Sequence, residues 1–555
     1  MGFCLISRRA GHLSSFCGSM ATMHSGAHKE DAITHIEHSN PTPAQKVEKA
    51  DAAAKFLANA HVDDASFSYE EERAVLKRVD YRVLPLLLGA YFFQQLDKSS
   101  LSYVSIFGLQ ADAKLVGRQY SWLGSILYLA QLVMQPLAAF LLVKLPTGKV
   151  IGTAIFLWGS SLAIMAACTD FKSLLGLRFV LGSFEAMIAP ACVATTTMWW
   201  RRSEQTLRTG YWNAMNGVTF IVGSLFTYGL GHINSESLHK YQVIFMFCGL
   251  LTVVYAFVVL VLMPDSPMKA RYLTERERFI AVERLRANQM GIQSGEWKWD
   301  QVWETLIDLK TWCWFIAIIA ISIASGGIST FGNLIIRDFG YTNFQSILFN
   351  IPFGVIQIVC ILGSSWGATR WSRKGLAIAL VAILPIIGTI MMLTVPRQHK
   401  GVLLFGYYLV SCLAAITPLI YTWHVQNTAG DTKKKCTSAM VFIGMCTGNV
   451  IGPLLYSVDD APLYRPGLIA NLVMFALVAI IALLIPVYLA LLNKRHAKRR
   501  EELGKSAVRV DESMLKKKEM TQKGVEMEAQ DQRQEHDNGF SDLTDMKNED
   551  FIYVY

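Results

Sequence analysis

Residues 84–103 read LPLLLGAYFFQQLDKSSLSY, an apolar run that contains an acid and a base side by side, Asp97 and Lys98. About 20 apolar residues in an α-helix cross the roughly 30 Å hydrocarbon core of a bilayer. A charged side chain at the centre of such a helix costs about 2.5 to 3.5 kcal/mol on insertion scales, so it persists where it faces a protein partner or a water-filled path. The stretch therefore indicates a membrane span with a functional role.

Similar apolar runs fill the middle of the chain. The 555 residues are 52% hydrophobic and 17% charged, which is too apolar for an ordinary soluble protein of this length. A membrane β-barrel would instead show alternating segments of about ten residues. We expect an all-α integral membrane protein with twelve transmembrane helices, near residues 83–107, 121–143, 150–168, 173–198, 208–231, 242–263, 312–336, 344–368, 376–395, 401–424, 437–457 and 467–492.

The longest connection between spans divides them six and six. It begins at Pro264 and includes Thr274 to Arg286, where a Thr cap, early acids and late arginines predict an amphipathic surface helix. The flanking regions are polar and predict disorder. The expected domains are a disordered arm, a first six-helix bundle, a linker, a second six-helix bundle and a disordered tail, over residues 1–78, 79–263, 264–310, 311–493 and 494–555.

Basic residues in alternate short loops predict the orientation of the chain. Such loops lie on the cytoplasmic side of a membrane, and here they alternate with loops that are less basic or offset by acids. We therefore expect both termini in the cytoplasm and a location in the plasma membrane. The basic loop residues are Lys144, Lys149, Arg201, Arg202, Arg208, Arg370, Arg373, Lys374, Lys433, Lys434 and Lys435.

Span four carries a second pair of charges, Arg178 and Glu185. Counting the helical rise from each surface places Asp97 about 20 Å up from the cytoplasm, Arg178 roughly 8 Å below the outer surface and level with Lys98, and Glu185 near the midplane. Seven residues are almost two helical turns, so Arg178 and Glu185 share one helix face.

These four charges allow two interpretations. An ion pair such as Asp97 with Arg178 would only hold spans one and four together, but buried pairs are a costly way to gain stability. In the functional interpretation Lys98 and Arg178 neutralise a substrate carboxylate. Glu185, with Asp97 as the second candidate, binds and releases a proton, because burial favours the neutral carboxyl and a nearby cation favours the ionised form.

Several neutral polar residues within the spans are weaker candidates, because interhelical hydrogen bonding explains such residues equally well. We take Gln94 and Asn333 as candidate substrate ligands. His424, at the cytoplasmic end of span ten, is a candidate gate residue. The remaining polar residues are Gln131, Gln135, Asn213, Asn216, Asn350, Gln357 and Asn449.

Residues 75–495 resemble the major facilitator superfamily, and within it the anion:cation symporter branch with the fungal allantoate permease group. The order and spacing of several short motifs carry the resemblance: Leu96-Asp97-Lys98, Gln119-Tyr120-Ser121-Trp122, Arg178 with Glu185, Trp199-Trp200-Arg201-Arg202, Arg208-Thr209-Gly210, Pro264-Asp265-Ser266-Pro267, Asn427 to Lys433 and Tyr464-Arg465-Pro466-Gly467.

The resemblance implies two six-helix bundles around a central site that opens alternately to either side. It also implies proton-driven uptake of carboxylates such as allantoate, ureidosuccinate, small peptides, nicotinate, pantothenate or biotin. Asp97, Lys98, Arg178 and Glu185 then occupy the substrate and proton sites. One departure is the loop after span two, which lacks the Asp-Arg core of the usual Gly-xxx-Asp-Arg-x-Gly motif; Lys144 and Lys149 are expected to keep a reduced gating role.

Two other classes of function are alternatives. A nutrient sensor would keep the fold and signal through its tails. A membrane enzyme lacks support, because the chain has no His-Glu-x-x-His, phosphate loop, dinucleotide fingerprint or Gly-x-Ser-x-Gly motif. We expect no cofactor, no metal and no nucleic-acid partner, and a monomeric carrier whose partners are a small anion, a proton and the lipid bilayer.

Overall fold

The computed structural model describes residues 56–57, 67–106, 109–116, 119–231, 238–285, 288, 297–341, 345, 348–456, 463–504 and 542–555. All of them fall within one unit, Val47–Tyr555. The regular elements of this described part are α-helices and short 3-10 helices.

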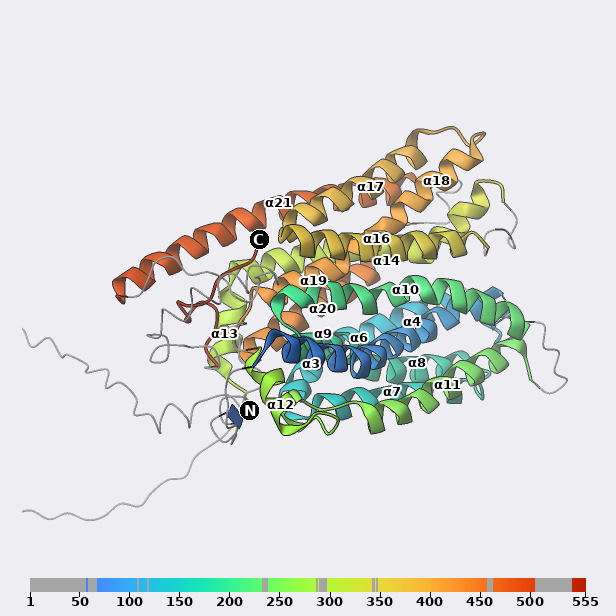
Figure 1. Cartoon of the computed structure of the whole chain (residues 1–555). Coiled ribbons are helices and arrows are strands. Elements are labelled where there is room, and N and C mark those ends of the chain that lie inside the picture. Colours follow the sequence, from blue (N-terminus) through green and yellow to red (C-terminus); the bar gives the residue numbers. More distant parts are fainter. Residues whose placement is uncertain are drawn as a thin grey trace, which may run out of the picture. The chain divides into compact units, whose positions relative to one another are not determined.

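The first half of the described chain forms one bundle of helices (Figure 1). Its fourth span consists of two helices, because α8 ends at Glu185 and α9 begins at Ile188. Pro190 explains the interruption, since it has no N–H to donate to the carbonyl of Ala186 four residues earlier. The helices of this half are α4 (Leu84–Ile106), α6 (Gln119–Lys144), α7 (Thr147–Met165), α8 (Phe171–Glu185), α9 (Ile188–Trp199), α10 (Arg202–Gly231) and α11 (Lys240–Leu262).

The second half forms the other bundle, which packs on the first mainly through α10 and α16, and through α6 and α20. Its fourth span is also divided, with a 3-10 turn between two α-helices. The elements of this half are α14 (Leu309–Asp338), α16 (Asn350–Trp371), α17 (Lys374–Thr394), α18 (Lys400–Val410), η3 (Ser411–Ala415), α19 (Ile416–Gln426), α20 (Asp431–Leu454) and α21 (Arg465–Glu502).

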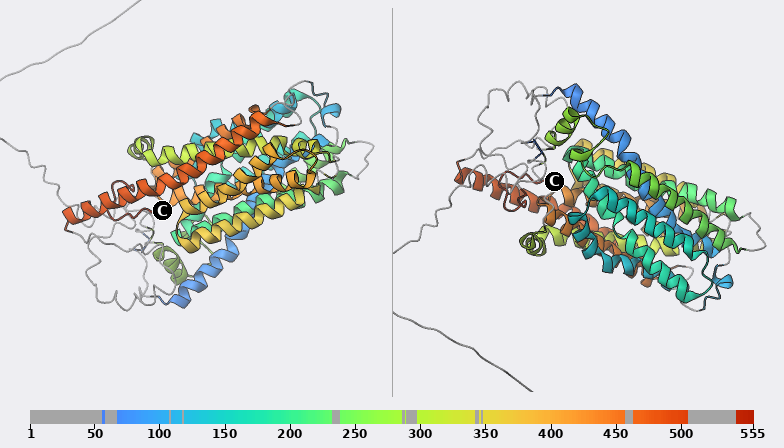
Figure 2. Two further views of the ribbon diagram at one scale, coloured as in Figure 1. Left: turned by 90° about the horizontal axis from the view of Figure 1, so that it is seen from above. Right: turned by 90° about the horizontal axis from the view of Figure 1, so that it is seen from below.

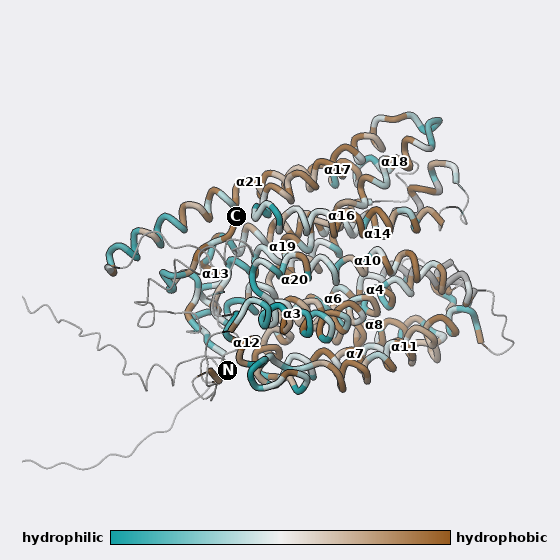
Figure 3. The backbone as a smooth tube through the Cα atoms, in the orientation of Figure 1, coloured by the Kyte–Doolittle hydropathy of each residue, from teal (hydrophilic) through white to brown (hydrophobic). Residues whose placement is uncertain are grey.

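These helices confirm the expectation of twelve spans. By length and composition alone, ten segments of the described chain could cross a membrane. The two others are α4 and α10, which fall outside that set although they are as long as their neighbours. Figure 3 shows apolar residues along the middle of the helices and hydrophilic ones gathered toward their ends. Helix bounds lie within a few residues of the expected spans, except that several helices extend further into the loops.

Short helices gather at one end of the bundles, which we call the linker end (Figure 1). They are α3 (Tyr69–Arg82), η1 (Pro267–Lys269), α12 (Glu275–Glu283) and α13 (Trp299–Ile307), whereas α5 (Leu109–Asp112) follows α4 at the opposite end. The linker does form a helix, α12, which ends at Glu283, and Thr274 caps it by accepting the Glu277 N–H. Its buried residues, Phe279 to Val282, are consecutive, so α12 lacks the single apolar face that was expected. Arg276 of α12 binds Glu71 of α3.

The tail differs from the expectation for residues 494–555. Helix α21 continues to Glu502, and residues 542–555 pack against the linker end instead of being disordered. Figure 2 shows the C-terminus lying against the helices there in both views. The sequence suggested disorder because the segment is short of apolar residues. The described tail is held largely by polar contacts, which hydropathy does not register. The arm expected to be disordered over residues 1–78 also differs, because α3 begins at Tyr69 and buries Val75. Residues 1–55, 58–66 and 505–541 lie outside the described part.

Candidate functional site

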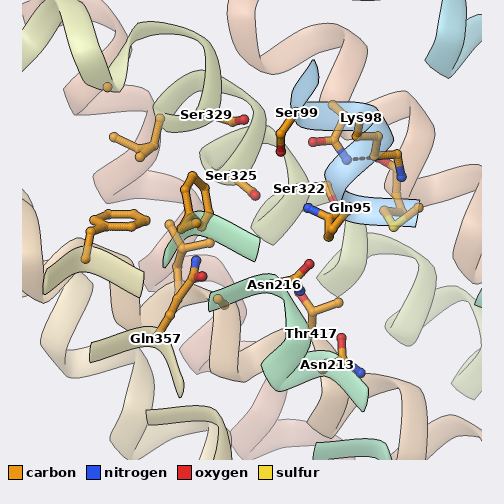
Figure 4. A pocket seen from close by; sticks show the side chains of 18 of the residues that line it. Gln95, Lys98, Ser99, Asn213, Asn216, Ser322, Ser325, Ser329, Gln357 and Thr417 are labelled. Atoms are coloured by element: carbon orange, nitrogen blue, oxygen red, sulfur yellow. Dashed lines mark hydrogen bonds between the residues drawn. The ribbon is translucent and has the colours of Figure 1, made fainter. Parts of the chain in front are cut away.

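A cavity of about 280 Å³ lies between the two halves. Helices α4, α6, α9 and α10 contribute its walls from the first half, and α14, α16, α18, η3, α19 and α20 contribute from the second. In Figure 4, Gln95, Lys98 and Ser99 of α4 stand across from Ser322, Ser325 and Ser329 of α14. A pocket of this kind, at the junction of two bundles, is where a small ligand binds in helical membrane proteins.

The lining is polar but nearly uncharged. Lys98 is the only ionisable acid or base among the described lining residues, apart from tyrosines. Amide and hydroxyl groups supply most of the remaining polar atoms. The cavity therefore offers both donors and acceptors for hydrogen bonds. The amide and hydroxyl residues are Gln94, Gln95, Ser99, Asn213, Asn216, Ser224, Ser322, Ser325, Ser329, Asn350, Gln357, Thr417 and Asn449.

Lys98 forms an ion pair with Glu185 at the edge of the cavity. The Lys98 Nζ lies 3.0 Å from Glu185 Oε1, and the Lys98 side chain is 15% exposed while that of Glu185 is 1% exposed. The ammonium also lies 5.8 Å from the centre of the Tyr128 ring. The lysine thus faces the cavity, and the carboxylate stands behind it.

The interruption of span four lies next to this pair. Glu185 is the last residue of α8, and the Ala186 carbonyl freed by Pro190 accepts a hydrogen bond from Gln135 Nε2 at 3.2 Å. Gln135 therefore links α6 to the interruption between α8 and α9. Its side chain is engaged in this contact and does not line the cavity. Glu185 thus lies at the point where span four changes from α8 to α9.

Asp97 points in another direction from Lys98. Consecutive residues in an α-helix are turned by about 100°, and Asp97 Oδ2 accepts hydrogen bonds from Trp158 Nε1 at 2.8 Å and Thr252 Oγ1 at 2.9 Å. Trp158 belongs to α7 and Thr252 to α11, so the carboxylate joins three helices of the first half. It is 1% exposed and does not line the cavity.

Arg178 is buried within the first half at 2% exposure and is not among the residues that line the cavity. Its positive charge lies close enough to act on Asp97 and on Tyr128, which does line the cavity. The structure thus brings Lys98 and Glu185 into contact beside the cavity. It places Asp97 and Arg178 deeper in the bundle.

Of the neutral polar residues considered from the sequence, some line the cavity and others lie elsewhere. Six of the amide residues named from the sequence line the cavity, including the candidate ligand Gln94. Gln131 instead accepts a hydrogen bond from the Cys446 thiol at 3.6 Å, between α6 and α20. The side chain of Asn333 lies outside the described part of the structure, although its backbone belongs to α14.

Three serines of α14 line the cavity and were not among the residues predicted from the sequence. Ser322, Ser325 and Ser329 are spaced by three and four residues, so they form one stripe along a helix face. That spacing is readable from the sequence and could have identified the face. Tyr91, Tyr128 and Tyr421 also line the cavity, but tyrosines in apolar runs carry no such pattern.

Aromatic rings close the cavity toward the linker end. Trp212 of α10 stacks on Tyr421 of α19 with 6.2 Å between ring centres, and Tyr91 of α4 lies 4.9 Å from Trp212. Nearer the linker end, Arg202 and Gln426 bond reciprocally, each side chain donating to the carbonyl of the other residue. The two halves are therefore closed against each other on this side of the cavity.

Of the three candidate gate residues, Lys144 and Lys149 lie apart from these contacts, whereas the His424 ring lies 6.5 Å from the Tyr421 ring. The Lys149 backbone N–H donates to Asp265 Oδ1 at 3.3 Å, while the side chains of Lys144 and Lys149 are exposed. A Cβ atom on Gly148, at the start of α7, would lie 3.0 Å from the same Asp265 oxygen, so the glycine suits this close approach. His424 is fully buried, and its ring nitrogens contact the Ile420 carbonyl and Ser438 Oγ.

Comparison with known proteins assigns the family. The family model described as Major Facilitator Superfamily matches residues 87–453. The chain belongs to the major facilitator superfamily. The Thiamine pathway transporter THI73 of Saccharomyces cerevisiae is 30% identical over 531 residues, which cover 93% of this chain and 95% of that protein. The Allantoate permease of the same yeast is 28% identical over 91% of this chain and 90% of its own length.

A solved structure supports the same fold. The fucose:proton symporter FucP of Escherichia coli matches with a TM-score of 0.54 and 15% sequence identity, covering 72% of this chain and 98% of that one. This member of the major facilitator superfamily is thus a multi-pass membrane transporter and not an enzyme. The cavity between its halves is accordingly the candidate transport site.

Proposed function

We propose that this carrier takes up a small organic anion by alternating access, driven by a proton. The substrate is a carboxylate that also carries groups able to donate and accept several hydrogen bonds. The observation behind the proposal is the ion pair of Lys98 and Glu185, in which the cation faces the cavity and the acid is buried behind it.

Charge balance links the substrate to the proton. While Glu185 is ionised, it neutralises Lys98; once Glu185 is protonated, the ammonium is available to a substrate carboxylate. Two unit charges about 4 Å apart interact by about 4 kcal/mol at an effective dielectric constant of about 20. This exceeds the roughly 1.4 kcal/mol that changes an equilibrium tenfold. Binding a carboxylate to Lys98 therefore favours a proton on Glu185, and loss of either one favours loss of the other.

Asp97 and Arg178 act on this site from behind it in the proposal. Asp97 is a positioning residue, because its bonds to Trp158 and Thr252 fix the turn of α4 that directs Lys98 to the cavity. Arg178 adds a positive charge near Asp97 and Tyr128, which favours an anion in the cavity. Proton binding by Asp97 and direct substrate contact by Arg178, Gln94 and Asn333 remain predictions.

The neutral lining supports the substrate class. Amide and hydroxyl groups from both halves can bind ureide, amide or hydroxyl groups of a substrate whose carboxylate lies on Lys98. The relative named Allantoate permease supports an organic anion of that kind. Among the alternatives, the lining favours a ureido or amide carboxylate over a purely aliphatic acid, which would leave many of these polar groups unpaired.

We further propose that the linker end faces the cytoplasm and that the carrier lies in the plasma membrane. The basic residues Lys149, Arg201 and Arg373 lie at this end of their helices, as the positive-inside rule expects for cytoplasmic loops. With this orientation the structure is closed toward the cytoplasm, and the cavity lies on the outer side of the aromatic closure.

The test is uptake by the purified carrier in liposomes, with a panel of labelled carboxylates and their neutral amides, at external pH 5 and pH 7. We expect a ureido or amide carboxylate to accumulate more at pH 5, and a protonophore to abolish that accumulation. Lys98→Ala should remove transport, whereas Lys172→Ala, an exposed lysine of the same half, should not. Equal uptake of the amides, or accumulation without a proton gradient, would contradict the proposal.

A further inference from the structure

Residues 542–555 pack into the linker end and bond to side chains there. We propose that residues 542–555 are an intramolecular latch that holds the two halves closed at this end, so that the tail regulates how often the carrier opens there. The proposal concerns conformation and is independent of which substrate the cavity binds.

One anchor of the latch is a buried cluster of charges. Lys310 contacts Asp308 and lies 2.6 Å from Asp545 Oδ2. Lys433 completes the cluster with three carboxylates, at 3.0 Å from Asp545 Oδ1, 2.9 Å from Asp308 and 2.8 Å from Glu304. Asp545 is thus the tail's contribution to a set of two cations and three acids, joining α14 and α20.

Asp545 is bound in its charged form. Burial alone would raise the pKa of this carboxyl group, but the ammonium groups of Lys310 and Lys433 outweigh the burial and hold the pKa well below its usual range. The Ala429 N–H also donates to Asp545 Oδ1 at 3.2 Å, and the Tyr553 hydroxyl lies 3.0 Å from Oδ2. Each oxygen therefore has two donors, one of which is an ammonium group, and such charge-assisted hydrogen bonds are the strong ones.

The second anchor is a set of bonds to the tail backbone. Asn427, which directly follows α19, bonds Val554 at both its carbonyl, 3.0 Å from Nδ2, and its N–H, 2.7 Å from Oδ1. Trp423 Nε1 donates to the same Val554 carbonyl at 3.0 Å. Asn493 of α21 bonds Tyr553 in the same two-sided way. Paired contacts of this type fix the register of the peptide on the second half.

One residue extends the latch to the first half. Arg202, at the start of α10, donates to the Ile552 carbonyl at 2.8 Å, and its guanidinium lies 4.8 Å from the centre of the Phe551 ring. The same guanidinium donates to the Gln426 carbonyl in the second half. The tail therefore adds two contacts at the point where the halves are closed against each other.

The tail buries polar side chains, which a segment lying loosely on the surface would leave in contact with water. Asp542, Thr544, Asp545, Asn548 and Asp550 are all buried polar residues, and such groups are costly to bury unless their partners are in place. Most partners lie in the second half, so the tail should move with that half. Opening at the linker end must separate Arg202 from Ile552 and Phe551.

The energetic consequence follows from alternating access. A hydrogen bond from a charged group such as Arg202 contributes enough to change a two-state ratio about tenfold. Losing the tail should therefore raise the ratio of carriers open to carriers closed at the linker end by about that factor. The effect requires no substrate, because the latch contacts lie outside the cavity lining.

The experiment measures distances between spin labels on the full-length carrier in lipid nanodiscs, after the native cysteines have been replaced. One pair, Lys149→Cys with Arg373→Cys, spans the two halves at the linker end. A second pair, Arg373→Cys with Lys494→Cys, lies within the second half. We expect deletion of residues 542–555, Asp545→Asn and Phe551→Ala to increase the long-distance population of the first pair and leave the second pair unchanged.

Glu502→Gln is the matched control, since it neutralises an exposed acid near the end of α21. It should leave both distance distributions as in the wild type. A synthetic peptide of residues 542–555 added to the deletion variant should restore the short distance. If the deletion variant does not fold, the distance distribution of the first pair in Phe551→Ala tests the latch instead. A wild-type distribution for the first pair in the folded variants, or equal broadening of both pairs, would overturn the latch.

Discussion

Two buried groups of lysines and carboxylates lie in different parts of this carrier. Lys98 and Glu185 form a single pair at the edge of the central cavity. Lys310 and Lys433 share Glu304, Asp308 and Asp545 at the linker end, away from the cavity. The residue types are the same, but the numbers of partners and the access to the cavity differ.

The difference separates a site that exchanges partners from one that holds parts together. Glu185 has a cation for a partner, and that cation also faces the cavity, so a ligand can compete for it. At the linker end each lysine has two or three carboxylates, and Asp545 has further donors. A satisfied buried network is stable as a whole, and removing one member is strongly destabilising. Variants in the two groups should therefore affect different properties.

The largest effect should follow from Lys310→Ala. It leaves Asp308 and Asp545 with one lysine fewer in a fully buried cluster, and breaking a buried pair in this way costs about 3 to 5 kcal/mol. Thermal unfolding of the purified carrier should start at a clearly lower temperature. Lys400→Ala, an exposed lysine of the same half, serves as the control. An unchanged unfolding temperature would show that the cluster adds no stability.

Lys98→Ala should show the opposite pattern. It removes the ammonium from the cavity, and we expect uptake to fall about 100-fold, the loss typical of truncating one partner of a buried charge pair. The unfolding temperature should fall less than in Lys310→Ala, because Lys98 is partly exposed to the cavity. Initial uptake rates and unfolding curves measured on the same preparations test both expectations. Retained uptake with unchanged apparent affinity would argue for a structural pair.

Glu185→Gln should alter coupling more than binding. The amide keeps the shape of the side chain but cannot carry a proton on and off, so accumulation against a gradient should fall about tenfold or more. Exchange of labelled for unlabelled substrate should continue. The ratio of uptake at pH 5 to uptake at pH 7 should approach one. Normal accumulation at acidic pH in this variant would exclude Glu185 as the proton carrier.

Trp158→Phe should have the smallest effect of the four. It removes one of the two hydrogen bonds to Asp97, which is worth about 1 to 3 kcal/mol when the acceptor is charged and buried. We expect a modest loss of stability and a higher apparent Km with the pH dependence retained. Tyr241→Phe, whose hydroxyl bonds the Cys168 carbonyl elsewhere in the bundle, is the comparison. A change in the pH dependence itself would indicate that Asp97 carries a proton.

The helices could be predicted because each span depends on a local run of apolar residues. Counting the helical rise was less successful for depth. It placed Lys98 level with Arg178 and Glu185 about 10 Å deeper, whereas the structure pairs Lys98 with Glu185 at 3.0 Å. The directions of neighbouring charges were harder to predict. Asp97 and Lys98 adjoin in the sequence but face different helices, and only the packing of α7 and α11 on α4 shows which one reaches the cavity.

The tail could not have been predicted by the same reasoning. Asp545 meets Lys310 and Lys433 across more than a hundred residues of sequence, and no periodic pattern connects them. The last five residues, Phe551 to Tyr555, are apolar or aromatic and were the one local signal that this end of the chain is buried. The serine stripe of α14, in contrast, was readable and was missed.

The end of the chain is itself a bonded group. The Lys374 N–H at the start of α17 donates to the Tyr555 carbonyl at 2.8 Å, and Asn493 donates to the Tyr555 hydroxyl at the same distance. A purification tag or a fluorescent protein joined to Tyr555 would pull on these contacts. Transport rates measured on such a fusion would then describe a carrier altered at its closure, and removing the tag before the assay avoids that change.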